Sequence, residues 1–245
     1  MAEPEDKIKL EKATEHHSEE DSTPVTDTKT ILIAVGIIIG IFAFSIVGFK
    51  LYEKYFSETQ VVNVDDLHKE NLQGELNEKE GYMYNGYSFV YVDGLWWTEV
   101  NRFGTLLKIP LHFGAKEVES IPVTGTLDSA FNNGELVYIA INPETANKYY
   151  TLALSELNFN IIKGIDRSIE AACTENNSIC DNRTIVSCEN TQGNPVVELA
   201  LTNYTDSANS GKIEFKGSCI RISGQDYELV KAVDKVLLRW YGIMK

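Results

Sequence analysis

Histidine and cysteine are scarce in this chain, with four of each among 245 residues. The cysteines are too far apart for the C-x₂₋₄-C knuckles of a zinc site or for the C-x-x-C of a redox pair. Outside the first 30 residues the only histidines are His68 and His112, and His112 alternates with Leu111 and Phe113 as in a strand. A structural or surface role for His112 is therefore favoured over nucleophilic catalysis.

Recognisable catalytic motifs are also missing. The chain contains no G-x-S-x-G, Walker A, G-x-G-x-x-G, H-E-x-x-H or EF-hand pattern. Carboxylates are plentiful, but spacing alone does not identify a glycosidase pair. We therefore predict no catalytic, cofactor-binding or metal site.

Basic residues are outnumbered, because 22 Lys and Arg face 36 Asp and Glu, for a formal net charge of −14 at pH 7. A nucleic-acid interface needs a Lys/Arg stripe with interleaved aromatic residues, and the sequence has none. Nucleic acid is therefore disfavoured as a partner. The acidic balance is typical of a solvated protein surface.

Only one long hydrophobic run is present, nineteen uncharged residues from Ile31 to Phe49 between Lys29 and Lys50. At about 1.5 Å rise per residue, such a helix just crosses a hydrocarbon core of about 30 Å. A cleaved signal peptide would have a basic segment before a shorter run and a small-residue cleavage site after it, and neither is present. The run predicts one uncleaved transmembrane helix over residues 30–50, in contact with membrane lipid.

Two signals disagree about the direction of this anchor. Near the membrane, Lys50 and Lys54 follow the run whereas only Lys29 precedes it, which leans towards a cytoplasmic C-terminal part. The four cysteines lie among Asn, Ser, Thr and Gly residues, which favours disulfides in an oxidising compartment. We expect a plasma-membrane protein with a cytoplasmic N-terminus and an extracytoplasmic C-terminal domain, with the reverse orientation as the alternative.

The anchor separates unlike parts of the chain. Residues 1–29 carry nine carboxylates against four lysines and almost no large apolar residues, which predicts a disordered acidic tail. Residues 51–80 are predicted to be a juxtamembrane connector, either a short amphipathic helix or a stalk. Residues 81–245 are long enough for one globular domain.

Strand and helix signals are mixed within residues 81–245. Asn85-Gly86 and Asp93-Gly94 separate aromatic and β-branched runs, which predicts a three-stranded meander. Helices are indicated over 142–164, with Asn142 as N-cap, and over 226–240. We expect an α+β fold, in which one N-terminal transmembrane helix precedes a mainly antiparallel β-sheet domain with two packed helices. Further strand-like runs occupy residues 106–113, 118–124, 136–141, 196–201, 212–215 and 219–222.

The cysteines allow three pairings. Cys173 and Cys180 flank a short polar loop, and Cys188 and Cys219 lie on strand-like segments expected to be adjacent. The favoured pairs are therefore Cys173 with Cys180 and Cys188 with Cys219.

The densest aromatic patch contains Tyr87, Tyr91, Trp96 and Trp97. Neighbouring strand residues point to opposite faces, so one tryptophan is expected to face the core and the other to face outward. An exposed aromatic row would bind a glycan or a protein partner, but burial on both faces under the helices is favoured.

Two weaker patterns concern assembly and modification. Gly36, Gly40 and Ala43 form a small-residue face on the anchor that would allow a helix homodimer, although small residues are common in such helices. Glycosylation sequons begin at Asn176, Asn182 and Asn203. Because such short motifs also arise by chance, they add little to the prediction of an external domain.

Several segments of the globular part stand out together: Asn85-Gly86-Tyr87, Gly94-Leu95-Trp96-Trp97-Thr98, Ile109 to Phe113, Ile121 to Gly125, Ala171 to Cys173 and Val230 to Met244. With these segments the chain resembles a family of membrane-anchored proteins of small-genome archaea. The resemblance implies an archaeal cell-envelope protein. It carries over no activity and no functional residue, and it leaves the orientation open.

The sequence therefore favours a single-pass, membrane-anchored envelope protein that presents a globular domain for binding or assembly, with an envelope protein or glycan as partner. One alternative is a membrane-tethered hydrolase of envelope polymers, and another is a cytoplasm-facing scaffold. Two convergent carboxylates in a pocket would favour the hydrolase. A flat exposed aromatic face would favour the binding protein.

Overall fold

The computed structural model describes residues 28–56, 63–102, 104–202 and 211–245, and the chain divides into two compact units, residues 1–61 and 62–245. The tail predicted over residues 1–29 lies outside the described residues, apart from its last two positions. Each unit has its own internal packing.

The described part of the first unit is a single helix, α1 (Thr28–Phe56), of 29 residues. Its segment Thr28–Tyr52 is long and apolar enough to cross a membrane, and none of that segment is buried within the protein. Ser45 Oγ donates a hydrogen bond to Ile41 O (2.8 Å), so its hydroxyl is satisfied inside the helix. The prediction of one apolar helix of membrane-spanning length is confirmed.

The small-residue face of α1 is sterically open. Nothing lies within 4 Å of a Cβ atom built on Gly36 or on Gly40. A second helix could therefore approach closely at these positions and at Ala43. Homodimerisation through this face stays a prediction.

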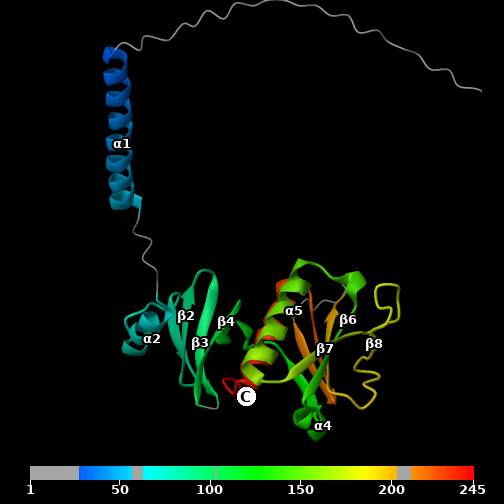
Figure 1. The fold of residues 1–245 in the computed structure, drawn as a ribbon. Helices are drawn as coiled ribbons and strands as arrows, with labels where there is room; N and C mark the ends of the chain where they lie inside the picture. Colours follow the sequence, from blue (N-terminus) through cyan, green and yellow to red (C-terminus); the bar gives the residue numbers. More distant parts are fainter. Residues whose placement is uncertain (1–27, 57–62, 103, 203–210) are drawn as a thin grey trace, which may run out of the picture. The chain divides into compact units, whose positions relative to one another are not determined.

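The second unit begins with an antiparallel meander (Figure 1). Its four strands pair in chain order: β1 (Gly81–Tyr84), β2 (Tyr87–Val92), β3 (Leu95–Arg102) and β4 (Thr105–Leu111). Both residues of each predicted turn have positive φ, 48° and 86° at Asn85-Gly86 and 52° and 83° at Asp93-Gly94. These are the type I′ values that two-residue hairpins require, so both predicted hairpins are confirmed.

Helix α2 (Val64–Gln73) packs on this meander. The Nδ2 atom of buried Asn71 lies 3.1 Å from Tyr82 O and 3.2 Å from Phe89 O, and so joins the helix to β1 and β2. Residues 63–80, predicted as part of a connector, therefore belong to the folded unit. Of the two alternatives for this segment, a short helix is the one present over Val64–Gln73. It is held through polar Asn71 and His68, while Leu72 is 65% exposed.

The second sheet is mixed and has seven strands in the order β5-β10-β11-β9-β6-β7-β8. Strands β11, β9, β6, β7 and β8 run parallel to one another, and β10 is antiparallel to β11 and parallel to β5. The strands are β5 (Val123–Leu127), β6 (Leu136–Ile141), β7 (Ser168–Cys173), β8 (Thr184–Ile185), β9 (Val196–Leu201), β10 (Lys212–Gly217) and β11 (Cys219–Gly224). The α+β class is confirmed. The expected antiparallel pairing holds for the first sheet. It does not hold for the second sheet, in which most neighbouring strands are parallel.

Short helices connect these strands. Helix α3 (Ala115–Val118) links the two sheets, and α4 (Ser129–Asn133) follows β5 with Asp128 as its N-cap. The helix predicted to begin after Asn142 begins later. Asn142 caps a separate 3-10 turn, η1 (Pro143–Thr145), and Asn147 Oδ1 accepts from Tyr149 N and Tyr150 N to start the helix proper.

The two long helices of this unit cover one face of the second sheet. Helix α5 (Lys148–Asn160) continues into a π-helical turn, η2 (Ile161–Ile165), and α6 (Tyr227–Trp240) follows β11. Helix α5 packs on β9, α6 packs on β10 and β11, and the two helices pack on each other (Figure 1). The buried side chains of the two helices and of both sheets form one core. This core includes Phe89, Trp96, Leu111, Leu157, Leu199, Ile220, Leu229 and Leu237.

The cysteine-bearing segment, residues 174–195, supplies edge strand β8 and then places Val186 and Cys188 against the other face of the second sheet. Val186 and Cys188 pack there against Ala140, Val196 and other small residues. Cys188 is bonded to Cys219 at the start of β11, and Cys173 at the end of β7 is bonded to Cys180. These are the two pairs that the spacing favoured.

We expect the two disulfides to contribute unequally to stability, because they close loops of different length. Their sequence separations are 31 for Cys188–Cys219 and 7 for Cys173–Cys180. Loop-closure entropy then predicts that the C188A/C219A variant loses about 4 kcal/mol of unfolding free energy and C173A/C180A about 2 kcal/mol. Guanidinium unfolding of the full chain in detergent micelles measures both.

Thiol blocking before reduction is the control for this comparison. The parent chain should gain no blocking groups before reduction and four after it, as read from the intact mass. Equal losses for the two variants, or four reactive thiols before reduction, would contradict the expected roles of the disulfides.

Candidate functional site

A hollow of about 590 Å³ lies at the carboxyl edge of the second sheet. Parallel pairing brings the carboxyl ends of β6, β7, β9 and β11 to this one edge. The residue that follows each strand lines the hollow: Asn142, Thr174, Thr202 and Gln225. In open sheets with parallel strands, ligands bind in crevices outside the carboxyl ends of the strands.

Half of the residues that line this hollow are uncharged and polar, including Thr145 and Ser187. The others are charged Glu175, Glu198 and Arg221 and apolar Leu199, Ala200 and Leu201. Some of the wall is fixed by local bonds, since Asn142 Oδ1 accepts from Glu144 N (3.1 Å) and Thr145 Oγ1 donates to Asn142 O (3.1 Å). Thr202 Oγ1 and Gln225 Oε1 are enclosed and have no hydrogen-bond partner among the described residues. Unpaired enclosed polar atoms cost about 1–3 kcal/mol each, so the wall is not optimised for stability alone.

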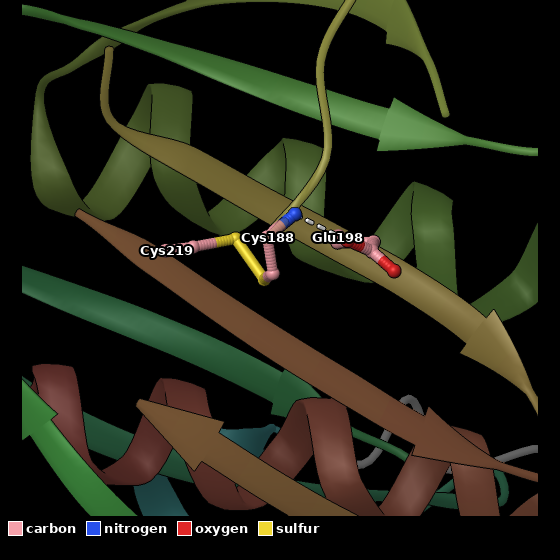
Figure 2. Close-up of side chains that lie close together, drawn as sticks. All are labelled: Cys188, Glu198 and Cys219. Carbon is pink, nitrogen blue, oxygen red and sulfur yellow. Dashed lines mark hydrogen bonds between the residues drawn. A yellow bond between two sulfur atoms is a disulfide. The ribbon is translucent and has the colours of Figure 1, made fainter. Parts of the chain in front are cut away.

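A charged pair forms another part of the wall. Glu198 Oε1 accepts from Arg221 Nε (3.0 Å), and Glu198 Oε2 accepts from the backbone N–H of Cys188 (2.6 Å). Figure 2 shows Glu198 next to the Cys188–Cys219 disulfide. Arg221 also bonds Glu189, and hydrogen bonds from Lys216 and Arg221 lower the pKa of Glu189. This network holds segment 174–195 on the sheet.

The grouping of Cys188, Glu198 and Cys219 does not form a metal centre. Their ligand atoms lie within 4.8 Å of one another, but both sulfur atoms are used in the disulfide. A thiolate must be free to ligate a metal. The remaining carboxylate is already paired with Arg221.

A second polar cluster joins β4 to both long helices, and we call His112, Glu156 and Asp234 the carboxylate clasp. Glu156 on α5 accepts from the backbone N–H of His112 (3.1 Å) and lies 3.0 Å from its Nδ1 atom. Asp234 on α6 accepts from the backbone N–H of Phe113 (2.8 Å) through Oδ2, and its carboxyl group lies close enough to Glu156 for the two to interact electrostatically. The clasp thereby fixes the end of the first sheet to the helices of the second.

Burial and the neighbouring charge of Glu156 raise the pKa of Asp234 well above its ordinary value. The hydrogen bond to Glu156 raises the pKa of His112. Two close carboxylates that share one proton are the pattern by which a catalytic pair is recognised. Here Asp234 is fully buried. Of the three clasp residues, only His112 and Glu156 line the neighbouring hollow of about 280 Å³, and the other residues that line it are mostly apolar. The pair thus lacks the joint access to substrate that the hydrolase alternative requires.

The predicted exposed aromatic patch is largely buried. Trp96 is 9% exposed and packs edge-on against Tyr82, with ring centroids 4.8 Å apart. Tyr87 and Trp97 are half-buried, and of the four only Tyr91, at 45%, is exposed. This agrees with the favoured alternative of burial and has a tertiary cause: one face of the meander joins the common core and α2 packs over part of the other. The residues around the hollow were not predicted, because they converge only through parallel pairing.

Comparison with known proteins identifies no relative: no family model, no curated protein and no solved structure matches the chain. Membership of an archaeal envelope family therefore stays a prediction. The fold and the geometry of the hollow are the observations that bear on function.

The carboxylate clasp predicts that the domain loses stability as the pH rises. Both Asp234 and His112 bind their protons more tightly in the folded state, so their contribution is present at low pH and is lost as the pH passes through the raised pKa values. The free energy of unfolding should therefore fall as the pH rises above about 4, the ordinary carboxyl pKa, and further above about 6.5, the ordinary imidazole pKa. Denaturant titrations of the full chain in micelles across this range measure the slope.

Asp234→Asn should flatten that slope, because the amide keeps the acceptor for Phe113 N and can donate to Glu156 without titrating. Asp93→Asn is the matched control, since Asp93 is exposed and Asn-Gly suits the same turn. A parent chain that gains stability towards pH 9, or a D234N slope equal to that of the parent, would refute the assignment of the shared proton.

Proposed function

We propose that this chain is a single-pass membrane protein whose external domain binds a neutral, hydroxyl-rich ligand such as a saccharide in the hollow at the carboxyl edge of its second sheet. The observation that carries this proposal is the convergence of four parallel strand ends on one polar hollow. Such edges are where open sheets with parallel strands bind small ligands.

The class of ligand follows from the charges and hydrogen-bonding groups in the wall. Six lining residues are uncharged donors or acceptors: Asn142, Thr145, Thr174, Ser187, Thr202 and Gln225. Glu198 and Arg221 neutralise each other, which leaves Glu175 as the other charged lining residue. A ligand that offers many hydroxyl groups and little charge satisfies such a wall without leaving a buried ion unpaired.

An external position of the domain is supported by its cysteines. All four are paired in disulfides, and disulfides persist in oxidising compartments. Helix α1 supplies an anchor of the length that lipid requires. Together these features favour a cytoplasmic N-terminus and a domain that samples ligands or polymers outside the membrane.

Binding can be tested with an array of neutral and acidic oligosaccharides and the full chain in lipid nanodiscs. We expect binding to neutral members and a loss of roughly tenfold or more in the T174V/Q225L variant, because two hydrogen bonds of about 1 kcal/mol each disappear. No hydrogen bond from either side chain occurs within the described part of the chain, so the substitutions remove ligand contacts without removing internal bonds.

Thr126→Val is the matched control, since Thr126 is an exposed strand residue that does not line the hollow. It should bind as the parent does. Absence of binding to any neutral oligosaccharide, or equal binding by the parent and by T174V/Q225L, would rule out the proposed use of the hollow.

A further inference from the structure

The loop closed by Cys173 and Cys180 presents an asparagine with a free side chain. Asn176 is exposed and lies outside regular secondary structure, and Ser178, the third residue of its sequon, is also exposed. The loop leaves the carboxyl end of β7, and Thr174 and Glu175 just before the sequon line the hollow. The sequon Asn176-Asn177-Ser178 is therefore accessible after the domain has folded.

The neighbouring Asn177 has a different role. Its Oδ1 accepts from the backbone N–H groups of Ile179 (3.0 Å) and Cys180 (3.1 Å), and its carbonyl oxygen accepts from Cys180 N as well. Asn177 thus forms the turn that brings Cys180 towards Cys173. The amide of Asn176 makes no such bond within the described residues, which leaves its Nδ2 atom available for reaction.

The sequon at Asn182 is held more tightly. Asn182 is exposed, with φ of 65° in a turn, but Thr184 is part of β8 and pairs with Ala172 of β7. Thr184 Oγ1 also lies 3.4 Å from Glu170 Oε1. The hydroxyl group that defines this sequon is therefore engaged with the sheet, in contrast to Ser178. The sequon at Asn203 lies outside the described residues.

We propose that Asn176 is a site of N-linked glycosylation and is preferred over Asn182. The donor is a lipid-linked oligosaccharide. A bond forms between Asn176 Nδ2 and C1 of the first sugar, the bond from C1 to the lipid phosphate oxygen breaks, and the amide loses one proton as the lipid phosphate leaves. The proposal rests on the external position of the domain proposed above.

The test is synthesis of the full chain in the presence of endoplasmic reticulum microsomes, whose lipid-linked oligosaccharide is the donor. Every variant carries Asn203→Gln so that the third sequon does not contribute. We expect one glycan, seen as a gel shift that endoglycosidase reverses. The shift should disappear in N176Q and in S178A.

Three matched variants should keep the glycan. N177Q retains the sequon at Asn176, S178T retains its hydroxyl, and N182Q removes only the competing site. Loss of the glycan in N182Q with retention in N176Q would overturn the proposal, and so would a chain that gains no glycan.

A topology reporter separates failure of this proposal from failure of the orientation. The substitutions Lys79→Thr and Glu80→Ala create a new sequon that begins at Asn77, in an exposed turn of the same unit, and remove the carboxylate that accepts from Asn77 Nδ2. A glycan on Asn77 without one on Asn176 would refute the site and leave the external orientation intact. If Asn77 also stays unmodified, the domain faces the cytoplasm, and both the site and the proposed orientation are overturned.

Discussion

The parallel pairing of β6, β7, β9 and β11 is the constraint on which the architecture of the folded unit depends. Parallel neighbours cannot be joined by tight hairpins, so the chain must cross over between them. The crossover from β6 to β7 contains α5, and the return from β7 to β9 is the cysteine-bearing segment on the opposite face. The same pairing brings the strand ends together, and the polar hollow forms where they meet.

The two faces of this sheet are covered by different chemistry. On one face α5 and α6 bury large apolar side chains in a core shared with the first sheet. On the other, a segment rich in polar residues buries little apolar surface and is held by the Cys188–Cys219 bond and by the bonds to Glu198. The disulfide therefore supplies cohesion where hydrophobic burial is small, which is the role that cross-links have in small or loop-rich structures.

Local elements followed from the sequence, and long-range partners did not. Asn85-Gly86 and Asp93-Gly94 have a turn preference set by their own backbone, so the hairpins were predictable. The predicted start of α5 was wrong, because Asn142 and Asn147 have the same capping chemistry. Only the surrounding chain decides which of them caps the helix. The sequence did not decide between a helix and a stalk for the segment that contains α2. The reason is that α2 contacts the sheet through Asn71 and His68 rather than through an apolar stripe.

The sequence by itself determined the membrane-length helix, the hairpins, the α+β class and the favoured cysteine pairs. Each depends on a continuous run, a dipeptide or a short spacing. Only the tertiary structure decided that the second sheet is largely parallel, that Trp96 is buried, and that Asn142, Thr174, Thr202 and Gln225 surround one hollow. These facts depend on which distant strands become neighbours. Strand order is set by the packing of the whole core, and no local pattern encodes it.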